Sequence, residues 1–132
     1  MSQPPPSKKL PSTPLLTVLR GEIYSAHLDP TEGSEQAGAR PVILVSRDAI
    51  NDNSRLVIAV PCTTYHTGRR LYPSQVLIHA PDGGLDVDSV ALGEQVRALD
   101  KRRLTRLRGV LSSAALAQLD AALLITLDLR LL

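Results

Sequence analysis

Apolar residues in the first half of the chain gather in short runs that turn-forming residues separate. Gly21–Leu28 mixes small, β-branched and aromatic residues and stops at Asp29-Pro30, which predicts a first strand. Arg40–Ser46 and Leu56–Val60 are apolar almost throughout, as is typical of strands buried on both faces. Pro61 is expected to close the third strand, because proline cannot donate a hydrogen bond within a sheet.

The second half of the chain carries shorter strand patterns. Gln75–His79 alternates in the manner of a strand at a sheet edge. Pro81-Asp82-Gly83-Gly84 is the strongest turn signal in the chain. Ser89–Leu92 and Gln95–Leu99 predict one or two further strands, with Gly93 between them as a candidate bulge.

Two helical segments are expected. Arg47–Asn53 predicts one short turn, and a long helix begins at Leu111-Ser112-Ser113, where either serine can cap it. Apolar residues recur along the long helix at three- and four-residue steps and form a stripe: Leu116, Leu119, Leu123 and Leu127, widened by Leu124 and Ile125. This stripe is expected to pack against the sheet or a second subunit. The whole pattern predicts a β-rich α+β domain, a small barrel of short strands with a C-terminal α-helix.

Length and composition are those of one globular domain preceded by a tail. The 132 residues are 43% hydrophobic, which excludes wholesale disorder, and no apolar run is long enough for a membrane span. Residues 1–17 hold five prolines among polar residues, so we expect a disordered Pro-rich tail before a domain at 18–132. Aromatic residues make up only 2% of the chain, which excludes a broad aromatic platform for stacking bases.

Charge and potential metal ligands narrow the function further. The formal net charge of +2 is too small to indicate nucleic-acid binding from bulk charge. The basic run from Lys101 to Arg108 is more often a solvated face than a phosphate track. Cys62 is the only cysteine, which excludes an intrachain disulfide and fits a reducing cytoplasm. With three scattered histidines, the chain has no metal-ligand spacing, and we expect no metal or other cofactor.

The segment from Gly33 to Pro41 carries the most concentrated chemistry. Its two glycines give the backbone access to positive φ, which predicts an adjustable loop. Glu35, Gln36 and Arg40 supply a carboxylate, an amide and a guanidinium, and the last of these sits at the root of a strand. By composition alone this is a solvated hairpin loop, although functional groups are often placed on such loops.

Four separated blocks of sequence resemble the MazF/PemK toxin family, in family order and with family-like spacing. The resemblance covers roughly residues 19–128. The blocks are Leu28–Pro41, Val60-Pro61-Cys62-Thr63-Thr64, Tyr72-Pro73, and Asp88–Arg97.

The resemblance implies an SH3-like β-barrel of the CcdB/MazF kind that forms a homodimer in the cytoplasm. It also implies a metal-independent, sequence-specific endoribonuclease that cleaves single-stranded RNA (mRNA) by 2′-OH attack. Such a protein is the toxin of a type II toxin–antitoxin pair and inhibits translation and growth. A MazE-like antitoxin is expected to occupy the RNA groove. Two alternatives remain open: a non-catalytic, CcdB-like toxin that binds DNA gyrase, and an inactive relative retained as a binding module.

Three residues are the catalytic candidates that the resemblance selects. Arg40 offers a planar, permanently charged fork for a phosphate whose charge rises in the transition state. Thr63 can orient the phosphate or the 2′-OH by hydrogen bonding. Glu35 can accept a proton or position the RNA or the loop, and positioning is favoured. Ala39 occupies a position that can be His in the family, so an acid–base role there does not carry over.

The RNA-binding candidates come from the loop at Gly33–Pro41, from Thr64 and the second loop that follows it (Tyr65–Tyr72), and from the last block of the resemblance. Amide and hydroxyl groups can read base edges, and a ring with two cations fits the path of a single-stranded backbone. The candidates are Gly33, Ser34, Gln36, Thr64, Tyr65, His66, Arg69, Arg70 and Gln95. The second loop departs from the family in length and content, so no RNA recognition sequence carries over.

Overall fold

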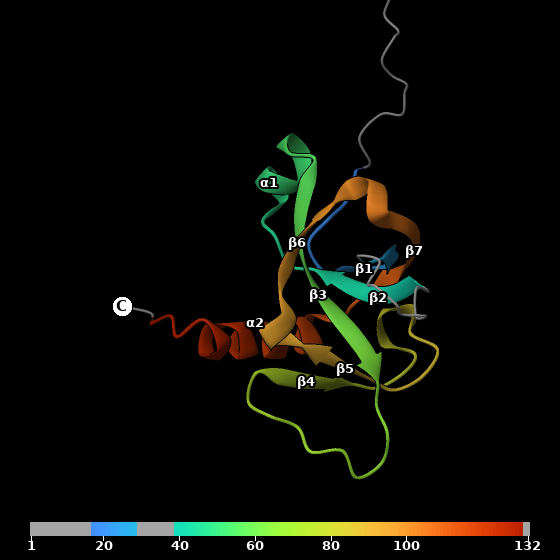
Figure 1. Cartoon of the computed structure of the whole chain (residues 1–132), viewed down its shortest axis with the longest axis vertical. Coiled ribbons are helices and arrows are strands. Elements are labelled where there is room, and N and C mark those ends of the chain that lie inside the picture. The colour runs from blue at the N-terminus through green and yellow to red at the C-terminus, as the bar shows by residue number, and fades with distance from the viewer. Residues whose placement is uncertain (1–16, 29–38, 131–132) are drawn as a thin grey trace, which may run out of the picture.

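The computed structural model describes residues 17–28 and 39–130 of the chain. These residues form an antiparallel seven-stranded sheet, one short helix and one long C-terminal helix (Figure 1). The strands are β1 (Glu22–His27), β2 (Ala39–Leu44), β3 (Leu56–Thr64), β4 (Gln75–Ile78), β5 (Ser89–Leu92), β6 (Arg97–Asp100) and β7 (Leu104–Val110). The helices are α1 (Asp48–Asn53) and α2 (Ser113–Thr126), with 3-10 turns η2 (Asp82–Gly84), η3 (Gly93–Gln95) and η4 (Lys101–Arg103).

Strand β3 is the centre of the sheet. The strand order is β4-β5-β3-β2-β1-β7, and β6 pairs with the first half of β3. The order ends at β4 and β7, so in the described residues no ladder closes the sheet into a barrel. The expected fold class is confirmed as an antiparallel sheet with a C-terminal helix.

Two apolar clusters fill the two faces of the sheet. On β2, Val42 and Leu44 belong to one cluster and Ile43, between them, to the other. Because successive strand residues point to opposite faces, β2 is buried on both sides, which explains its continuous apolar sequence. The alternation predicted for β4 is also present, with Val76 and Ile78 buried.

Helix α2 covers one of these faces. Ser112 caps it as expected, since its hydroxyl accepts a hydrogen bond from the Ala115 amide at 3.2 Å. Leu119 is fully buried, and Leu116 and Leu123 pack against the same cluster. Farther along, the stripe leaves the core: Ile125 and Leu127 are 59% and 52% exposed.

The structure differs from the expected elements at three places. Pro61 does not close β3, which continues to Thr64, because β3 changes its partner from β2 to β5 there. Gly93 is not a bulge: it begins η3, where an added Cβ would collide with the Ser74 carbonyl oxygen. Strand β7, within the supposedly solvated basic run, was not predicted. No helix in the described part of the chain is long and apolar enough to cross a membrane.

Candidate active site

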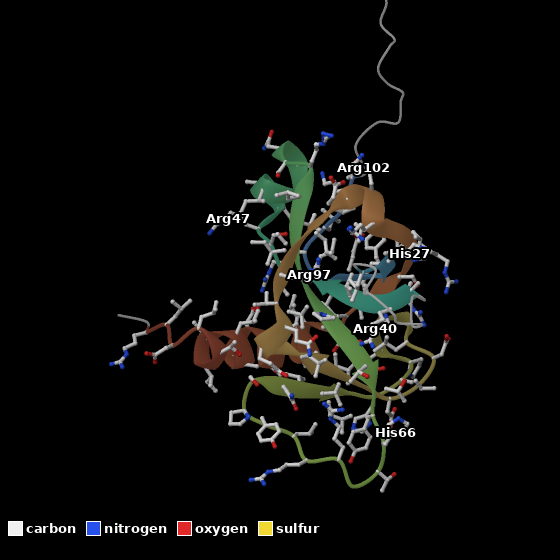
Figure 2. All side chains as sticks on the ribbon, in the orientation of Figure 1. His27, Arg40, Arg47, His66, Arg97 and Arg102 are labelled. Atoms are coloured by element: carbon white, nitrogen blue, oxygen red, sulfur yellow. The ribbon has the colours of Figure 1, made fainter. Side chains whose placement is uncertain are left out.

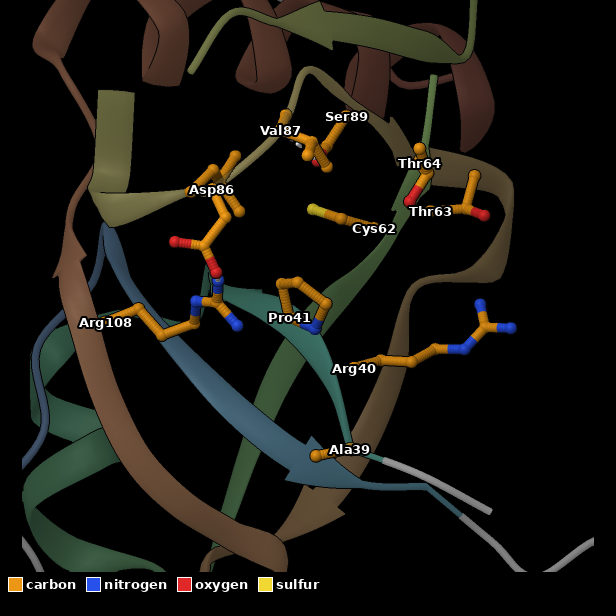
Figure 3. A pocket seen from close by; sticks show the side chains of 11 residues that line it. Ala39, Arg40, Pro41, Cys62, Thr63, Thr64, Asp86, Val87, Ser89 and Arg108 are labelled. Carbon is orange, nitrogen blue, oxygen red and sulfur yellow. Dashed lines mark hydrogen bonds and ion pairs between the residues drawn. The ribbon is translucent and has the colours of Figure 1, made fainter. Parts of the chain in front are cut away.

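A cleft opens where β2 and β3 part. The two strands pair from Val42–Pro61 to Leu44–Ala59. Beyond that ladder, β2 stays paired with β1 as far as Ala39, whereas β3 pairs with β5 from Cys62 to Thr64. The cleft between them has a volume of about 320 Å³ (Figure 3). Its lining is Ala39, Arg40, Pro41, Cys62, Thr63, Thr64, Leu85, Asp86, Val87, Ser89 and Arg108.

Arg40 and Thr63, two of the expected catalytic residues, both line this cleft. Carrying the β2–β3 register two residues past Val42–Pro61 sets Arg40 opposite Thr63, so both side chains leave the strands on the same face. Figure 3 shows them extending to the same side, away from Arg108. Arg40 is exposed, and within the described residues its guanidinium has no hydrogen-bond partner. A cation and a hydroxyl are therefore available to an anion.

The opposite wall of the cleft holds a second arginine. The Arg108 side chain is only 13% exposed; Nη2 donates to Asp86 Oδ2 at 2.9 Å and Nη1 to Ser25 Oγ at 3.3 Å. Arg108 Nε is buried and has no partner among the described residues. By sequence Arg108 belongs to a basic run typical of a solvated face, and no motif singles out Asp86, so the sequence does not predict this wall.

Cys62 forms part of the cleft floor as an inert thiol. It is 1% exposed, and burial raises the pKa of the thiol to about 12, although the charge of Arg108 acts in the opposite direction. A thiol with this pKa is protonated at neutral pH, and a buried, protonated thiol is a poor nucleophile.

The second loop continues directly from β3 beyond the cleft. The Tyr65 amide donates to the Asp88 carbonyl at 2.8 Å, and the Arg70 guanidinium lies 5.5 Å from the centre of the Tyr72 ring. Glu94 closes the far end of the loop by accepting hydrogen bonds from Ser74 and Gln75. Figure 2 places His66 on the same side of the molecule as Arg40.

The expected site residues fall into three groups. The structure brings Arg40, Thr63 and Thr64 together in the cleft. Tyr65, His66, Arg69 and Arg70 follow in the adjoining loop, and Gln95 lies in η3; none of these five lines the cleft. Gly33, Ser34, Glu35 and Gln36 lie outside the described residues.

No histidine lies in the cleft. His27 ends β1, and His79 Nδ1 lies 3.4 Å from Asp88 Oδ2. Hydrogen bonds from the Ala80 amide and His79 lower the pKa of Asp88, so this carboxylate is ionised at neutral pH. No group of three or more His, Cys, Asp or Glu side chains suited to a metal ion occurs in the described part of the chain.

The antiparallel sheet, the C-terminal helix and the cleft between parting strands define a class of small β-rich proteins. A family described as PemK-like, MazF-like toxin of type II toxin-antitoxin system matches residues 19–127. The chain belongs to this family.

Individual relatives agree with that assignment. The chain is 45% identical over 114 residues to Endoribonuclease MazF9 of Mycobacterium tuberculosis (strain ATCC 25618 / H37Rv), covering 83% of this chain and 96% of the relative. A mycobacterial endoribonuclease solved in complex with its cognate antitoxin is 29% identical, with a TM-score of 0.71 over 87% of this chain and 99% of that one. MazF from Deinococcus radiodurans is 29% identical, with a TM-score of 0.69 over 86% and 99%.

Proposed function

We propose that this protein is the endoribonuclease toxin of a type II toxin–antitoxin pair and cleaves single-stranded RNA at specific sequences without a metal ion. The observation that carries the proposal is the placement of Arg40 and Thr63 on one face of two diverging strands, with the Arg40 guanidinium unpaired in the described structure. The relatives that bear the name endoribonuclease support the same reaction.

The reaction that suits this site is attack of the RNA 2′-OH on the adjacent phosphorus. The products are a 2′,3′-cyclic phosphate and a strand with a 5′-OH. Because the nucleophile belongs to the substrate, the protein has three tasks: to help deprotonate the hydroxyl, to stabilise charge at phosphorus and to protonate the leaving oxygen.

Arg40 stabilises the charge at phosphorus in this scheme. Its fork can donate two parallel hydrogen bonds to non-bridging oxygens, and its pKa above about 12 makes it an electrostatic group rather than a proton donor. Thr63 orients the phosphate or the 2′-OH through its hydroxyl. Glu35 is proposed to position the RNA or the loop, with proton acceptance as its other role.

The remaining RNA contacts follow the chain away from the cleft. Thr64 lies at the edge of the cleft and leads into the second loop, whose exposed cations and rings can follow a single-stranded backbone. We assign RNA binding to the same residues as in the sequence analysis: Gly33, Ser34, Gln36, Thr64, Tyr65, His66, Arg69, Arg70 and Gln95.

The biological setting follows from the family. We infer that the substrate is mRNA, that cleavage inhibits translation and growth in the cytoplasm, and that a MazE-like antitoxin blocks the groove. A related endoribonuclease solved with its cognate antitoxin supports this partner. We further infer a homodimer, and an SH3-like barrel as the architecture of the sheet.

Incubation of the purified protein with a long single-stranded RNA in EDTA tests the proposal. The wild type should make discrete cuts, Arg40→Ala and Thr63→Ala should lose them, and Arg47→Ala should retain them. Arg47 is the matched control, because it is an exposed arginine on the opposite side of the molecule (Figure 2). Intact RNA accompanied by gyrase-dependent DNA breaks would overturn the assignment, and cleavage lost in EDTA would overturn its metal independence.

A further inference from the structure

The half of the cleft away from Arg40 has the composition of a pocket that binds a nucleobase. Pro41, Cys62, Leu85 and Val87 give it apolar walls, and the Arg108–Asp86 ion pair lies at one side (Figure 3). A volume of about 320 Å³ for the whole cleft is at the lower end of the range in which small-molecule sites fall. Apolar walls with a few fixed polar groups are the usual composition of such sites.

Close backbone packing sets this ion pair in place. Gly84 has a φ of +77°, and a Cβ there would collide with the Arg108 carbonyl oxygen. A Cβ on Gly109 would lie 2.7 Å from the Gly83 backbone. Because these glycines let η2 lie directly on β7, the segment after η2 carries Asp86 over the Arg108 side chain.

Arg108 retains unused hydrogen-bond donors. A guanidinium has five N–H donors, and Arg108 makes only two hydrogen bonds within the described structure, to Ser25 and Asp86. Asp86 is 84% exposed, so its carboxylate has free acceptor positions beside those donors. The pair therefore presents donors and acceptors side by side, with no net charge between them.

We propose that this pocket binds one unstacked guanine base of the RNA substrate and so contributes to sequence specificity. The inference rests on the proposed function, because it places the base beside the phosphate held by Arg40. Guanine carries a carbonyl oxygen next to two N–H donors, N1–H and N2–H, on one edge. Arg108 donates to O6, and the two oxygens of Asp86 accept from N1–H and N2–H.

The same features disfavour a phosphate in this pocket. The carboxylate of Asp86 repels an anion and cancels the charge of Arg108, whereas a neutral base uses both partners. Pro41 and the 51%-exposed Val87 offer apolar surface to the faces of the ring. Pro41 and Cys62 directly follow and precede Arg40 and Thr63 along their strands, so their side chains point to the other face. All four residues line the same cleft between the parting strands, which connects the pocket to the phosphate site.

Two experiments test the proposal: mapping of the cleavage sites, and replacement of one guanine in the RNA by inosine. Sequencing the ends from a random-sequence RNA should show guanine enriched at one position near the cut. Replacing that guanine by inosine, which lacks the N2 amino group, should lower the cleavage rate roughly tenfold for the wild type. For Asp86→Asn the guanine-to-inosine ratio should fall to about two, because the amide has one acceptor oxygen.

Asp52→Asn, in an exposed residue of α1 that does not line the cleft, is the matched control and should keep the wild-type ratio. Absence of guanine enrichment, or an unchanged ratio in Asp86→Asn, would overturn the pocket while leaving the nuclease assignment intact. If the wild type cleaves no RNA, the proposed function fails. Fluorescence anisotropy with guanine- and inosine-containing oligonucleotides then tests the pocket by itself, and equal affinities would overturn it.

Discussion

The side chain of Arg40 is exposed, whereas its backbone is held in a strand. Its backbone belongs to β2, which pairs with β1 at Ala26, while its guanidinium extends into the cleft without a partner in the described structure. A side chain anchored on a strand can be placed reproducibly, and an unpaired guanidinium need not break an ion pair before it binds phosphate.

Arg40→Lys separates charge from geometry at this position. Lysine keeps the positive charge but presents a point charge in place of the planar fork. We expect RNA affinity to change only a few-fold and the single-turnover cleavage rate to fall by roughly 10²-fold, the loss typical of removing one charge-stabilising donor. Binding and single-turnover assays on the same RNA check this, and wild-type cleavage by Arg40→Lys would refute the bidentate role.

Cys62 lies between Pro61 and Thr63, and its thiol is buried in the floor of the cleft. Burial raises its pKa from 9.0 to about 12, so the thiol stays protonated through the physiological range. Because the folded-state pKa is raised, burial of the thiol favours the folded state below pH 9, and this contribution is lost as pH rises toward 12.

Alkylation by iodoacetamide between pH 7 and 10 checks this protonation state. The denatured protein should react faster with rising pH and level off above about pH 9, as a free thiolate does. The native protein should react roughly 10²-fold more slowly or less across the range, and its rate should not level off there. Fast labelling of native Cys62 would show that the thiol is accessible.

At the scale of elements, β3 determines the site. Its first four residues pair with β6, its middle with β2 and its last three residues with β5, so the strand changes sheet partners beside Pro61. Pro61 is tolerated because its missing N–H falls where one ladder ends and another begins. From sequence, the same proline indicates a strand end, and the expected boundary was wrong by four residues, Pro61 to Thr64.

Sequence predicts most of the other elements because their apolar patterns are regular. β1, β2, β4, β5, α1 and α2 lie where expected, with boundaries shifted by a few residues. β7 is the exception: its register shifts twice against β1, and Thr105, Arg106 and Leu107 are all exposed in succession. Buried and exposed residues therefore do not alternate along β7 as they do in a regular strand. Its arginines look in sequence like a solvated charged run.

Only one side of the cleft, the side with Arg40 and Thr63, can be predicted from local sequence patterns. Arg40 and Thr63 belong to local motifs that resemble a family, so their residue types and positions indicate a role. Arg108 and Asp86 meet only because the glycines of η2 pack against β7, and this contact joins segments that are 22 residues apart. No local pattern records such a contact.

Gly84→Ala tests the packing of η2 on β7, with Gly68→Ala as its matched control. Both glycines have positive φ, but nothing lies within 4 Å of a Cβ on Gly68, whereas one on Gly84 meets the Arg108 backbone. We expect Gly68→Ala to cost about 1 kcal/mol of unfolding free energy and Gly84→Ala at least about 3 kcal/mol. Urea unfolding measures both, and equal losses would contradict the close approach.

At the scale of the whole molecule, the segment just before β1 joins several elements. Val18 is fully buried in the cluster that includes Tyr24 and Leu44. Arg20 donates to the Val45 carbonyl at 2.7 Å and pairs with Asp120 of α2, and its amide donates to Asp48 at the start of α1. The folded domain therefore depends on residues from Val18 onward.

Two truncations test the predicted boundary between tail and domain. A protein beginning at Thr17 should melt within about 2 °C of the full chain, because the truncation removes no contact between the residues that the structure describes. A protein beginning at Glu22 loses Val18, Arg20 and Gly21 and should melt about 10 °C lower or more. Equal melting temperatures for the two truncations would contradict this boundary.

In the proposed reaction the 2′-OH of the RNA is the nucleophile, and Arg40 and Thr63 act on the phosphate. The most direct test is a cleavable oligoribonucleotide with one 2′-deoxy substitution on the nucleotide immediately 5′ of the cut. We expect cleavage of this substrate to be abolished, whereas the same substitution elsewhere should change the rate only a few-fold, and the normal product should carry a 2′,3′-cyclic phosphate. Cleavage of the substituted bond at the normal rate would contradict attack by the 2′-OH.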